Sequence, residues 1–241
     1  MGKGQNLIIN GSGSYPGGMY DKISIRGEGI IVNDVECSTF HVYGTSEARD
    51  NVKTGSVKIM GEAEVKGDIA ANDTLVMGTM MVGQNASLKK MKVFGLLEVG
   101  EKLSGDEATI KGSISVKGDV EYETFDSSGG FEIKGLLTAD KIKIALRFGQ
   151  STAKEIGGGK IIVKRRKNSI LPFGREEGAL SAKVIEGDDI YLENTTAEVV
   201  RGNTVKIGPG CQIGLVEYST ELKSDSSSAI KSKINTQPQS K

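Results

Sequence analysis

Residues 57–73 read VKIMGEAEVKGDIAAND, residues 74–90 read TLVMGTMMVGQNASLKK, and residues 91–107 read MKVFGLLEVGEKLSGDE. The three segments have equal length, and each carries a glycine in its fifth position with a β-branched residue two places before it. An internal repeat of this kind is typical of solenoid proteins, in which each copy forms one coil and stacks on the next.

The repeat extends in both directions from these three segments. The glycine column, at a spacing of 17, consists of Gly27, Gly44, Gly61, Gly78, Gly95 and Gly112, and the next copy follows at Gly135, at a spacing of 23. Other columns with the same spacing are apolar, and the column two places before the glycine consists of Ile25, Val42, Ile59, Val76, Val93, Ile110 and Ile133. The sequence therefore repeats in its core positions as well as in its glycines.

Apolar and polar residues alternate within each copy, as in Val57-Lys58-Ile59 and Ile114-Ser115-Val116. This period of two indicates short strands with one buried face. Seventeen extended residues trace a path of about 56 Å, which fits one circuit of a narrow triangular coil. We therefore predict an all-β fold, a parallel β-helix (β-solenoid) with coils of about 17 residues, and we interpret the glycines as corner residues that adopt positive φ.

The organisation predicted along the chain has five parts. They are a flexible segment at 1–22, a β-solenoid at 23–146, an insertion or hinge at 147–178, a second solenoid segment with repeats of about 15 residues at 179–218, and a disordered tail at 219–241. The termini are assigned as disordered because they are rich in Gly, Ser and other polar residues.

The composition argues against several function classes. The chain has 31 basic and 31 acidic residues, so no overall field attracts nucleic acid. Its two cysteines lie far apart and no signal peptide is recognisable, which predicts free thiols in the cytoplasm. No apolar run approaches the length of a membrane span.

Catalytic motifs are weak. His41 is the only histidine and shares a column with polar and basic residues, so we interpret it as a surface residue without a partner for acid–base chemistry. The run from Gly157 to Lys160 lacks the first glycine and the hydroxyl residue of a phosphate-binding loop. No metal-binding constellation is recognisable. We predict that the chain is not an enzyme and uses no cofactor.

Two surface features are candidates for contacts. An apolar patch is expected on one flank, where the alternation points the residues outward; it consists of Tyr43, Met60, Leu75, Met77, Met81, Phe94 and Leu96. Either another segment of the chain covers this patch, or it packs filaments side by side or docks a partner. The second feature is a basic run, a candidate for membrane contact, that consists of Lys164, Arg165, Arg166 and Lys167.

The repeat columns resemble those of the bactofilins, bacterial cytoskeletal proteins that form polymers. The resemblance covers about residues 23–218 and is carried by segments such as GEAEVKGDI (61–69), IKGSISVKGDV (110–120) and VKIGPGCQIGLVEY (205–218). The double-length layout resembles longer members from Gram-positive rod-shaped bacteria. The resemblance implies a right-handed β-helix that assembles end to end, without nucleotide, into non-polar filaments. The terminal-coil residues that would form the polymer contact are Ile23, Ile25, Ile213, Leu215 and Tyr218.

The function expected from this resemblance is a self-assembling scaffold for cell-envelope, cell-shape or motility (flagellar) machinery. Its expected partners are further copies of the chain, or a sister bactofilin, with peripheral contact at the inner face of the cell membrane, and neither nucleic acid nor a small-molecule substrate. Two alternatives remain open. One is an enzyme like the left-handed β-helix acyltransferases, which would require His41; the other is a β-solenoid binding module that does not polymerise.

Overall fold

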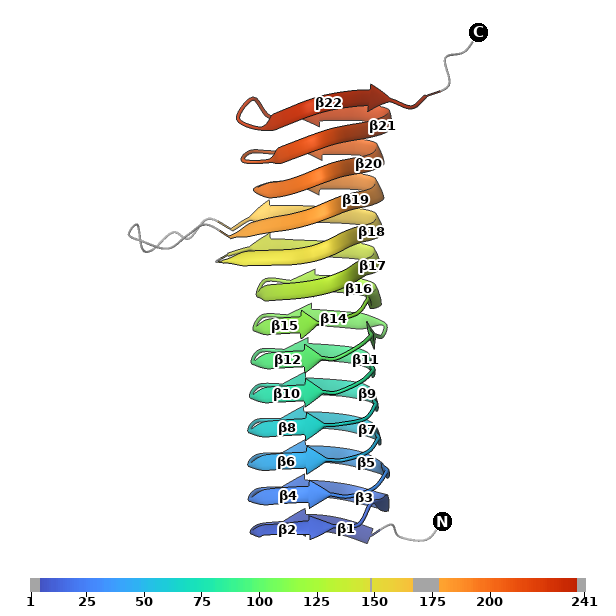
Figure 1. The fold of residues 1–241 in the computed structure, drawn as a ribbon, viewed down its shortest axis with the longest axis vertical. Coiled ribbons are helices and arrows are strands. Elements are labelled where there is room, and N and C mark those ends of the chain that lie inside the picture. Colours follow the sequence, from blue (N-terminus) through green and yellow to red (C-terminus); the bar gives the residue numbers. More distant parts are fainter. Residues whose placement is uncertain (1–4, 148, 167–177, 238–241) are drawn as a thin grey trace, which may run out of the picture. The chain divides into compact units, whose positions relative to one another are not determined.

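The protein is described here by a computed structural model that covers residues 5–147, 149–166 and 178–237, and every regular element in these ranges is a β-strand. The chain forms two compact units, Met1–Val120 (unit 1) and Glu121–Lys241 (unit 2). Within each unit, successive strands pair in parallel to form the coils of a β-solenoid (Figure 1). The predicted fold class is confirmed in both units.

Unit 1 is built from short strands. Their bounds are β1 (Gln5–Ile9), β2 (Ser12–Tyr15), β3 (Gly18–Ile25), β4 (Glu28–Ile31), β5 (Val35–Val42), β6 (Thr45–Ala48), β7 (Val52–Ile59), β8 (Glu62–Val65), β9 (Ile69–Val76), β10 (Thr79–Val82), β11 (Ala86–Val93), β12 (Leu96–Val99), β13 (Leu103–Ser104), β14 (Glu107–Ile110) and β15 (Ser113–Val116). Unit 2 holds longer strands: β16 (Val120–Ser127), β17 (Gly130–Leu146), β18 (Gln150–Arg165), β19 (Ala179–Leu192), β20 (Thr195–Ile207), β21 (Gln212–Ser224) and β22 (Ala229–Asn235).

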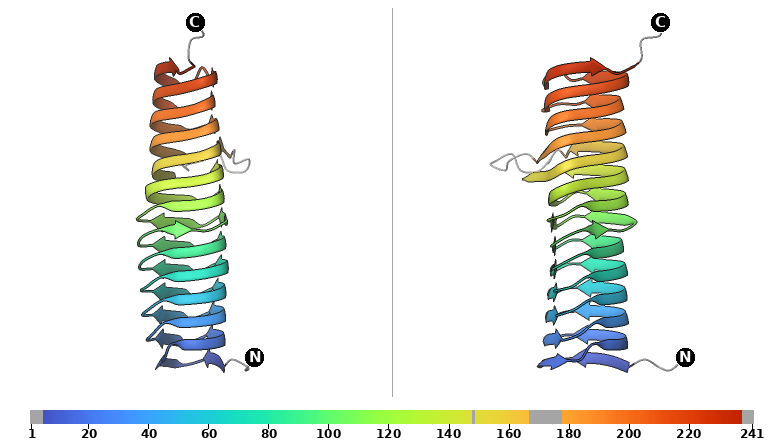
Figure 2. Two further views of the ribbon diagram at one scale, coloured as in Figure 1. Left: turned by 90° about the vertical axis from the view of Figure 1, so that its right-hand side faces the viewer. Right: turned by 45° about the vertical axis from the view of Figure 1, so that its right-hand side comes forward.

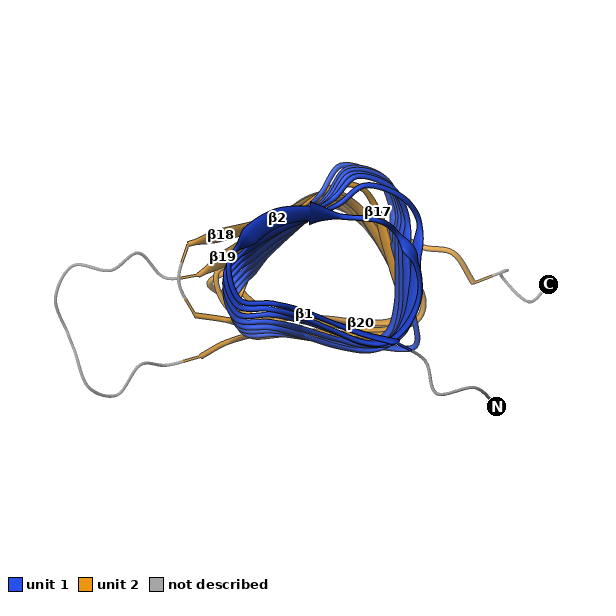
Figure 3. Cartoon of the chain, turned by 90° about the horizontal axis from the view of Figure 1, so that it is seen from below, with its two compact units in different colours: residues 1–120 blue, residues 121–241 orange. Residues whose placement is uncertain are grey.

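One coil of unit 1 has three sides, which give the roughly triangular outline seen along its axis (Figure 3). In the coil of β5 and β6 the ladder is interrupted at Ser38, which divides β5 into two sides, and β6 forms the third. The side chains that point inward and are buried are Val35, Cys37, Phe40, Val42, Ser46 and Ala48. Each stacks on the equivalent residue of the next coil, as Val42 does on Ile59, so the inward columns form continuous stacks.

Large and small side chains compensate for one another within a coil. Phe40 is 1% exposed, and in the same coil the small residues Ser46 and Ala48 supply the inward side chains of the third side. In the coil of β11 and β12, a small Ala86 stands beside Leu88, Met91 and Leu97. A close-packed interior favours such combinations, because a large side chain in one position leaves room only for small ones opposite it.

The glycine column has a different cause from the one expected. Positive φ is confined, among the glycines described, to Gly18, Gly149 and Gly210, none of which belongs to the column. A Cβ at Gly78 would instead lie 2.0 Å from the carbonyl oxygen of Gly61 in the preceding coil. The column therefore needs glycine because adjacent coils approach too closely at this corner for any side chain, not because of backbone conformation.

A second corner of unit 1 is held by a ladder of alternating Asp and Asn. Asn51 donates from its backbone N–H and its side-chain Nδ2 to Asp34 Oδ1, each at 3.0 Å. Asn85 makes the same pair of bonds to Asp68 Oδ1, at 2.9 and 3.0 Å. Asn51 Oδ1 in turn accepts from the backbone N–H of Asp68 at 2.8 Å. Because the amides separate the carboxylates, like charges never stand in adjacent coils of this stretch.

In unit 2 each of β17 to β21 is one long strand that bends at the corners, so the ribbon runs around most of each of these coils (Figure 2). The predicted 15-residue repeat is confirmed by the pairing of β19 with β20, in which Ala182 faces Ala197 and Leu192 faces Ile207. The interval lengthens by one position in the next coil, where Ala197 faces Ile213.

The insertion predicted at 147–178 is wrong in its first half. Residues 150–165 form β18, which pairs with β17 on one side and β19 on the other. Gln150 pairs with Ala179, an interval almost twice as long as the one between Leu180 and its partner Thr195. The additional residues therefore come after β18, and β18 itself is a regular strand of the solenoid. The sequence pattern conceals this strand because the glycines at 157–159 resemble a loop, although Gly158 stacks on Gly187.

The two segments expected to be loose also differ from the prediction. Residues 5–22 contain β1, β2 and most of β3, and β1 pairs in parallel with β3. At the other end β21 continues to Ser224, and β22 pairs with β21 from Gln212 to Tyr218. Both segments are polar, yet their backbone groups can bond to a coil that is already formed, so they add to the solenoid without contributing much core.

Candidate functional site

The end of unit 1 at β1 is the first candidate surface. Leu7 and Ile9 extend two inward columns, since they pair with Ile23 and Ile25 of β3. Ile9 is fully buried, Leu7 is half-buried, and the outward Ile8 is 54% exposed. The second side of this coil, β2, pairs with β4. The coil therefore ends the stack with a strand edge and with a partly open core column.

Tyr15 partly covers this end. Its ring lies against Gly13, because a Cβ placed on Gly13 would lie 3.3 Å from Cε2 and from the hydroxyl oxygen of Tyr15. Tyr15 pairs with Ile31, so its side chain occupies an inward column of the first coil. The ring therefore fills space that the missing side chain of Gly13 leaves open in this coil.

The end of unit 2 at β22 is more polar. Ile230 stacks above Ile213, and Ile234 is 48% exposed. Between and beside them stand the exposed Lys231, Ser232 and Lys233. The part of β21 from Thr220 to Ser224 extends past the stretch that β22 covers, and Leu222 there is half-buried.

The residues expected to form the polymer contact lie one coil inside these ends. Ile23, Ile25 and Ile213 are each at most 2% exposed. Leu215 and Tyr218 are paired on both sides, with Val199 and Gly202 below and Ser232 and Asn235 above. Their predicted place in the terminal coils is wrong, because β1 and β22 add coils beyond the boundaries expected for the solenoid. The sequence holds a signal for β1, since Gly11 precedes Gly27 at nearly the spacing of the glycine column, and a Cβ on Gly27 would meet the Gly11 carbonyl at 2.2 Å.

The apolar patch predicted on unit 1 does lie on its surface. We call four of its residues, which occupy one column at the glycine corner, the corner stripe: Tyr43, Met60, Met77 and Phe94, which are 43%, 45%, 50% and 47% exposed. Met81 is 37% exposed, and Leu75 and Leu96 are half-buried beside the stripe. Nothing within the described part of unit 1 covers these four side chains.

Cationic and aromatic contacts mark both ends of the corner stripe. Lys111, the next residue in its column, places its Nζ 5.1 Å from the centre of the Phe94 ring. At the other end the His41 ring meets the Tyr43 ring edge to face, with centroids 6.5 Å apart. Burial and the nearby charges of Lys22 and Lys58 lower the pKa of His41, so its imidazole is mainly neutral at neutral pH.

The basic run begins within a strand. Lys164 lies at the end of β18 with its Nζ 5.4 Å from the centre of the Tyr191 ring, and the backbone N–H of Arg165 donates to Glu193 Oε2 at 2.7 Å. Arg166 is exposed, and Lys167 lies outside the described residues. The described part of the run is therefore held against β19 rather than carried on a free loop.

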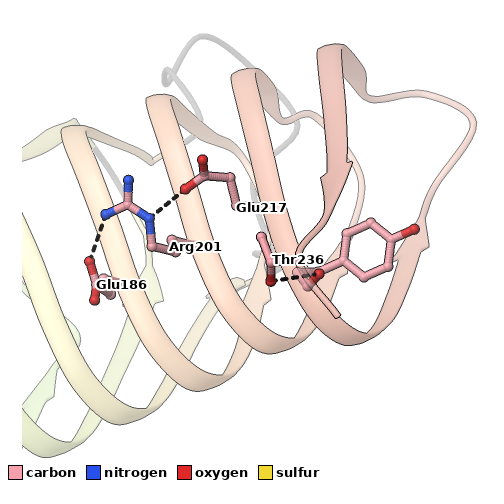
Figure 4. A network of polar contacts seen from close by, with 5 residues as sticks. Glu186, Arg201, Glu217 and Thr236 are labelled. Carbon is pink, nitrogen blue, oxygen red and sulfur yellow. Dashed lines mark hydrogen bonds and ion pairs between the residues drawn. The ribbon is translucent and has the colours of Figure 1, made fainter. Parts of the chain in front are cut away.

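Grooves are present on the described part of unit 2. One, of about 920 Å³, has a floor that includes Ala153 and Ala182 and a rim that includes Lys154 and Lys183. Another, of about 640 Å³, is crossed by a chain of ion pairs in which Arg201 binds Glu186 in the coil below and Glu217 in the coil above (Figure 4). Thr236 Oγ1 donates to the Tyr218 carbonyl at 3.2 Å in the same region.

The described residues show neither a disulfide nor a cluster of metal-binding side chains. Cys37 and Cys211 are free and buried, and burial raises the pKa of both thiols. No group of three His, Cys, Asp or Glu side chains in the described ranges is arranged to hold a metal ion. The described residues also include no helix with the length and apolar character needed to cross a bilayer.

Comparison with known proteins gives full-length relatives. The chain is 56% identical over 227 residues to the uncharacterized protein YhbE of Bacillus subtilis (strain 168), covering 94% of this chain and 96% of YhbE. It is 49% identical over 228 residues to the uncharacterized protein YhbF of the same organism, covering 95% of this chain and 96% of YhbF. No family model and no solved structure matches. On the strength of these two matches, the chain belongs to the protein family of YhbE and YhbF.

Proposed function

We propose that the protein is a scaffold of the bactofilin type, which assembles end to end into filaments without a nucleotide and without enzymatic activity. One observation carries the proposal: the coil of β1 ends unit 1 with a strand edge above a core column that is not closed. Leu7 remains half-buried, although Ile23 and Phe40, the next two members of its column, are buried.

The end of a solenoid can bind another end for the same reasons that hold its coils together. A strand laid against β1 would satisfy the free backbone groups of its edge and would continue the columns of Leu7 and Ile9. Association of this kind needs no energy source, because the bonds formed are those of an ordinary coil. We further propose that filaments support cell-envelope, cell-shape or motility machinery near the inner face of the membrane.

A non-polymerising module is the second candidate, and the polar end of unit 2 is the observation that favours it. Lysines on a terminal strand are a common means of preventing edge-to-edge association, and β22 exposes Lys231 and Lys233. A chain capped there could still join its β1 ends in pairs, which would give dimers and no filaments.

Negative-stain electron microscopy of the full-length protein at physiological salt separates the two candidates. We expect filaments, and uniform particles the size of one or two chains would refute the scaffold proposal. Two neighbouring substitutions on β1 then locate the contact. Leu7→Lys places a charge in the open core column and should abolish filaments or dimers, whereas Ile8→Lys changes an outward side chain of the same strand and should leave them intact.

A further inference from the structure

The corner stripe of unit 1 lies between two columns of opposite charge. Three positions before each column glycine stand His41, Lys58, Leu75, Lys92 and Thr109, which we call the basic flank after its two lysines, because His41 is mainly neutral at neutral pH. Three positions after it stand Glu47, Glu64, Met81, Glu98 and Ser115, which we call the acidic flank. Both flanks point outward, one on each side of the glycine corner.

The two flanks match each other coil by coil. In successive coils His41 corresponds to Glu47, Lys58 to Glu64, Leu75 to Met81, Lys92 to Glu98, and Thr109 to Ser115. The single apolar residue of the basic flank thus lies in the same coil as the single apolar residue of the acidic flank. Wherever one flank carries a lysine, the other carries a glutamate.

Contacts within the chain do not account for this match. Glu47 and Glu64 bind Arg49 and Lys66 of their own strands and turns, not the basic flank. Lys58 and Lys92 take part in none of the ion pairs found among the residues that the structure describes. The stripe that separates the flanks is apolar and is 43–50% exposed. Such a surface, with complementary charges at its two margins, is typical of a contact between proteins.

We propose that this surface binds the same surface of a second copy of the chain, with the two solenoid axes parallel and the coils in register. The proposal rests on the proposed function, because the copies would belong to neighbouring filaments. A two-fold axis parallel to the stripe places the basic flank of each copy opposite the acidic flank of the other. Lys92 then faces the partner subunit's Glu98, Lys58 faces the partner subunit's Glu64, and Leu75 faces the partner subunit's Met81.

The antiparallel arrangement lacks this complementarity. If one copy is inverted about the level of Met77, Lys58 faces the partner subunit's Lys92, and Glu64 faces the partner subunit's Glu98. Like charges opposite one another oppose association. The order of residues along the flanks therefore selects the parallel, in-register pairing.

The size of the surface explains why filaments are needed. Its four stripe residues span three coil intervals, or about 14 Å at the usual spacing between strands. A contact about 14 Å long buries less area than the roughly 800 Å² per partner of a stable protein–protein interface. Isolated chains should therefore not pair, whereas filaments that present the surface in every subunit should bundle.

Electron microscopy and low-speed sedimentation of filaments test the surface. We expect the unmodified chain to form bundles and Met77→Lys to form single filaments only. Met19→Lys is the matched control, because Met19 is 81% exposed and lies outside the stripe; it should bundle normally. An absence of filaments would overturn the proposed function and this inference together. Single filaments of the unmodified chain, or unchanged bundles with Met77→Lys, would overturn only the inference.

Charge reversal tests the parallel register. Lys92→Glu and Glu98→Lys should each weaken bundling, and the double variant should restore it, because each copy then again presents opposite charges to its partner. Stronger bundling with Lys92→Glu alone would indicate the antiparallel arrangement and overturn the proposal.

Chemical crosslinking tests the register independently. Tyr43→Cys and Phe94→Cys filaments should each crosslink to themselves with a short bismaleimide, and a mixture should give no 43-to-94 product. Cys37 and Cys211 are buried and provide a low background. Failure of both variants to crosslink to themselves would overturn the parallel register, and a 43-to-94 product in the mixture would indicate an antiparallel pairing centred on the middle of the stripe.

Discussion

Gly78→Ala distinguishes two physical reasons for the glycine column. The φ of Gly78 is not positive, so alanine can adopt this backbone conformation. If backbone conformation were the only reason for glycine here, alanine should stabilise the fold by about 0.4–1 kcal/mol, because it restricts the unfolded chain. The structure predicts the opposite sign. The new Cβ would lie 2.0 Å from the carbonyl oxygen of Gly61 and 2.7 Å from that of Met60, and both are backbone atoms that cannot rotate away.

Relief of this clash requires neighbouring coils to separate locally. Overpacking of a rigid interior typically costs about 1–3 kcal/mol, and we expect the upper part of this range because the clash also strains the hydrogen bonds between coils. The bonds concerned include those from the backbone N–H groups of Met77 and Thr79 to Ile59 and Gly61, at 2.8 and 2.9 Å. The assay is guanidinium unfolding followed by circular dichroism, with amide hydrogen exchange to report on these groups.

Gly11→Ala is the control for Gly78→Ala. Gly11 begins the same column at the end of unit 1, but a Cβ there meets nothing within 4 Å, and its φ is not positive. This variant should be neutral or slightly stabilising. If Gly78→Ala were as stable as the unmodified chain, with unchanged exchange in β9 and β10, close approach of the coils could not be the reason for the glycine column.

Two further predictions concern groups whose ionisation the fold controls. Asn51→Asp would put a carboxylate between Asp34 and Asp68, so that three adjacent coils carry carboxylates in one column, and it would remove a side-chain hydrogen bond of 3.0 Å. This variant should therefore destabilise the fold by about 1–2 kcal/mol at neutral pH. The loss of stability should shrink as the pH falls towards 4, because protonation of the new carboxylate removes the repulsion. The control Asn72→Asp changes an exposed residue outside the ladder, so it should show neither the loss of stability nor its dependence on pH. Tyr191 donates to Glu193 Oε1 at 2.6 Å, and this bond, with burial and the Glu193 charge, raises the pKa of Tyr191 to about 12. Since an unfolded tyrosine ionises near pH 10, the stabilisation from this group should be complete below about pH 10 and lost as the pH rises towards 12. An ultraviolet titration measures this ionisation, and Glu193→Gln should move it to lower pH. An unchanged ionisation of Tyr191 in Glu193→Gln would contradict the assignment.

The columns of unit 1 are predictable from sequence because stacking repeats the same environment in every coil. Ile25, Val42 and Ile59 share a column in the sequence and pair in the structure for the same reason. The cause of the glycine column is not predictable, since the separation of two coils at a corner does not follow from composition. The last coil could not be predicted because β22 is stabilised mainly by backbone hydrogen bonds to β21, and such bonds leave little apolar pattern in the sequence. Apart from Ala229, the only apolar residues within β22 are Ile230 and Ile234.

Folding explains the inward columns of unit 1 but not its corner stripe. An inward residue such as Val76 is fully buried, so its apolar character is required by the core. Met77 is the next residue, and with half of its surface exposed it gains little from the coil. The glycine beside it brings successive coils together, which aligns Tyr43, Met60, Met77 and Phe94 into a continuous apolar surface rather than scattered residues. The same column carries Arg26 and Lys111 immediately beyond these four, so charged side chains fit the position equally well. Because the fold accepts a charge there and uses none in the four central coils, the apolar residues are better explained by a contact outside the chain than by its own stability.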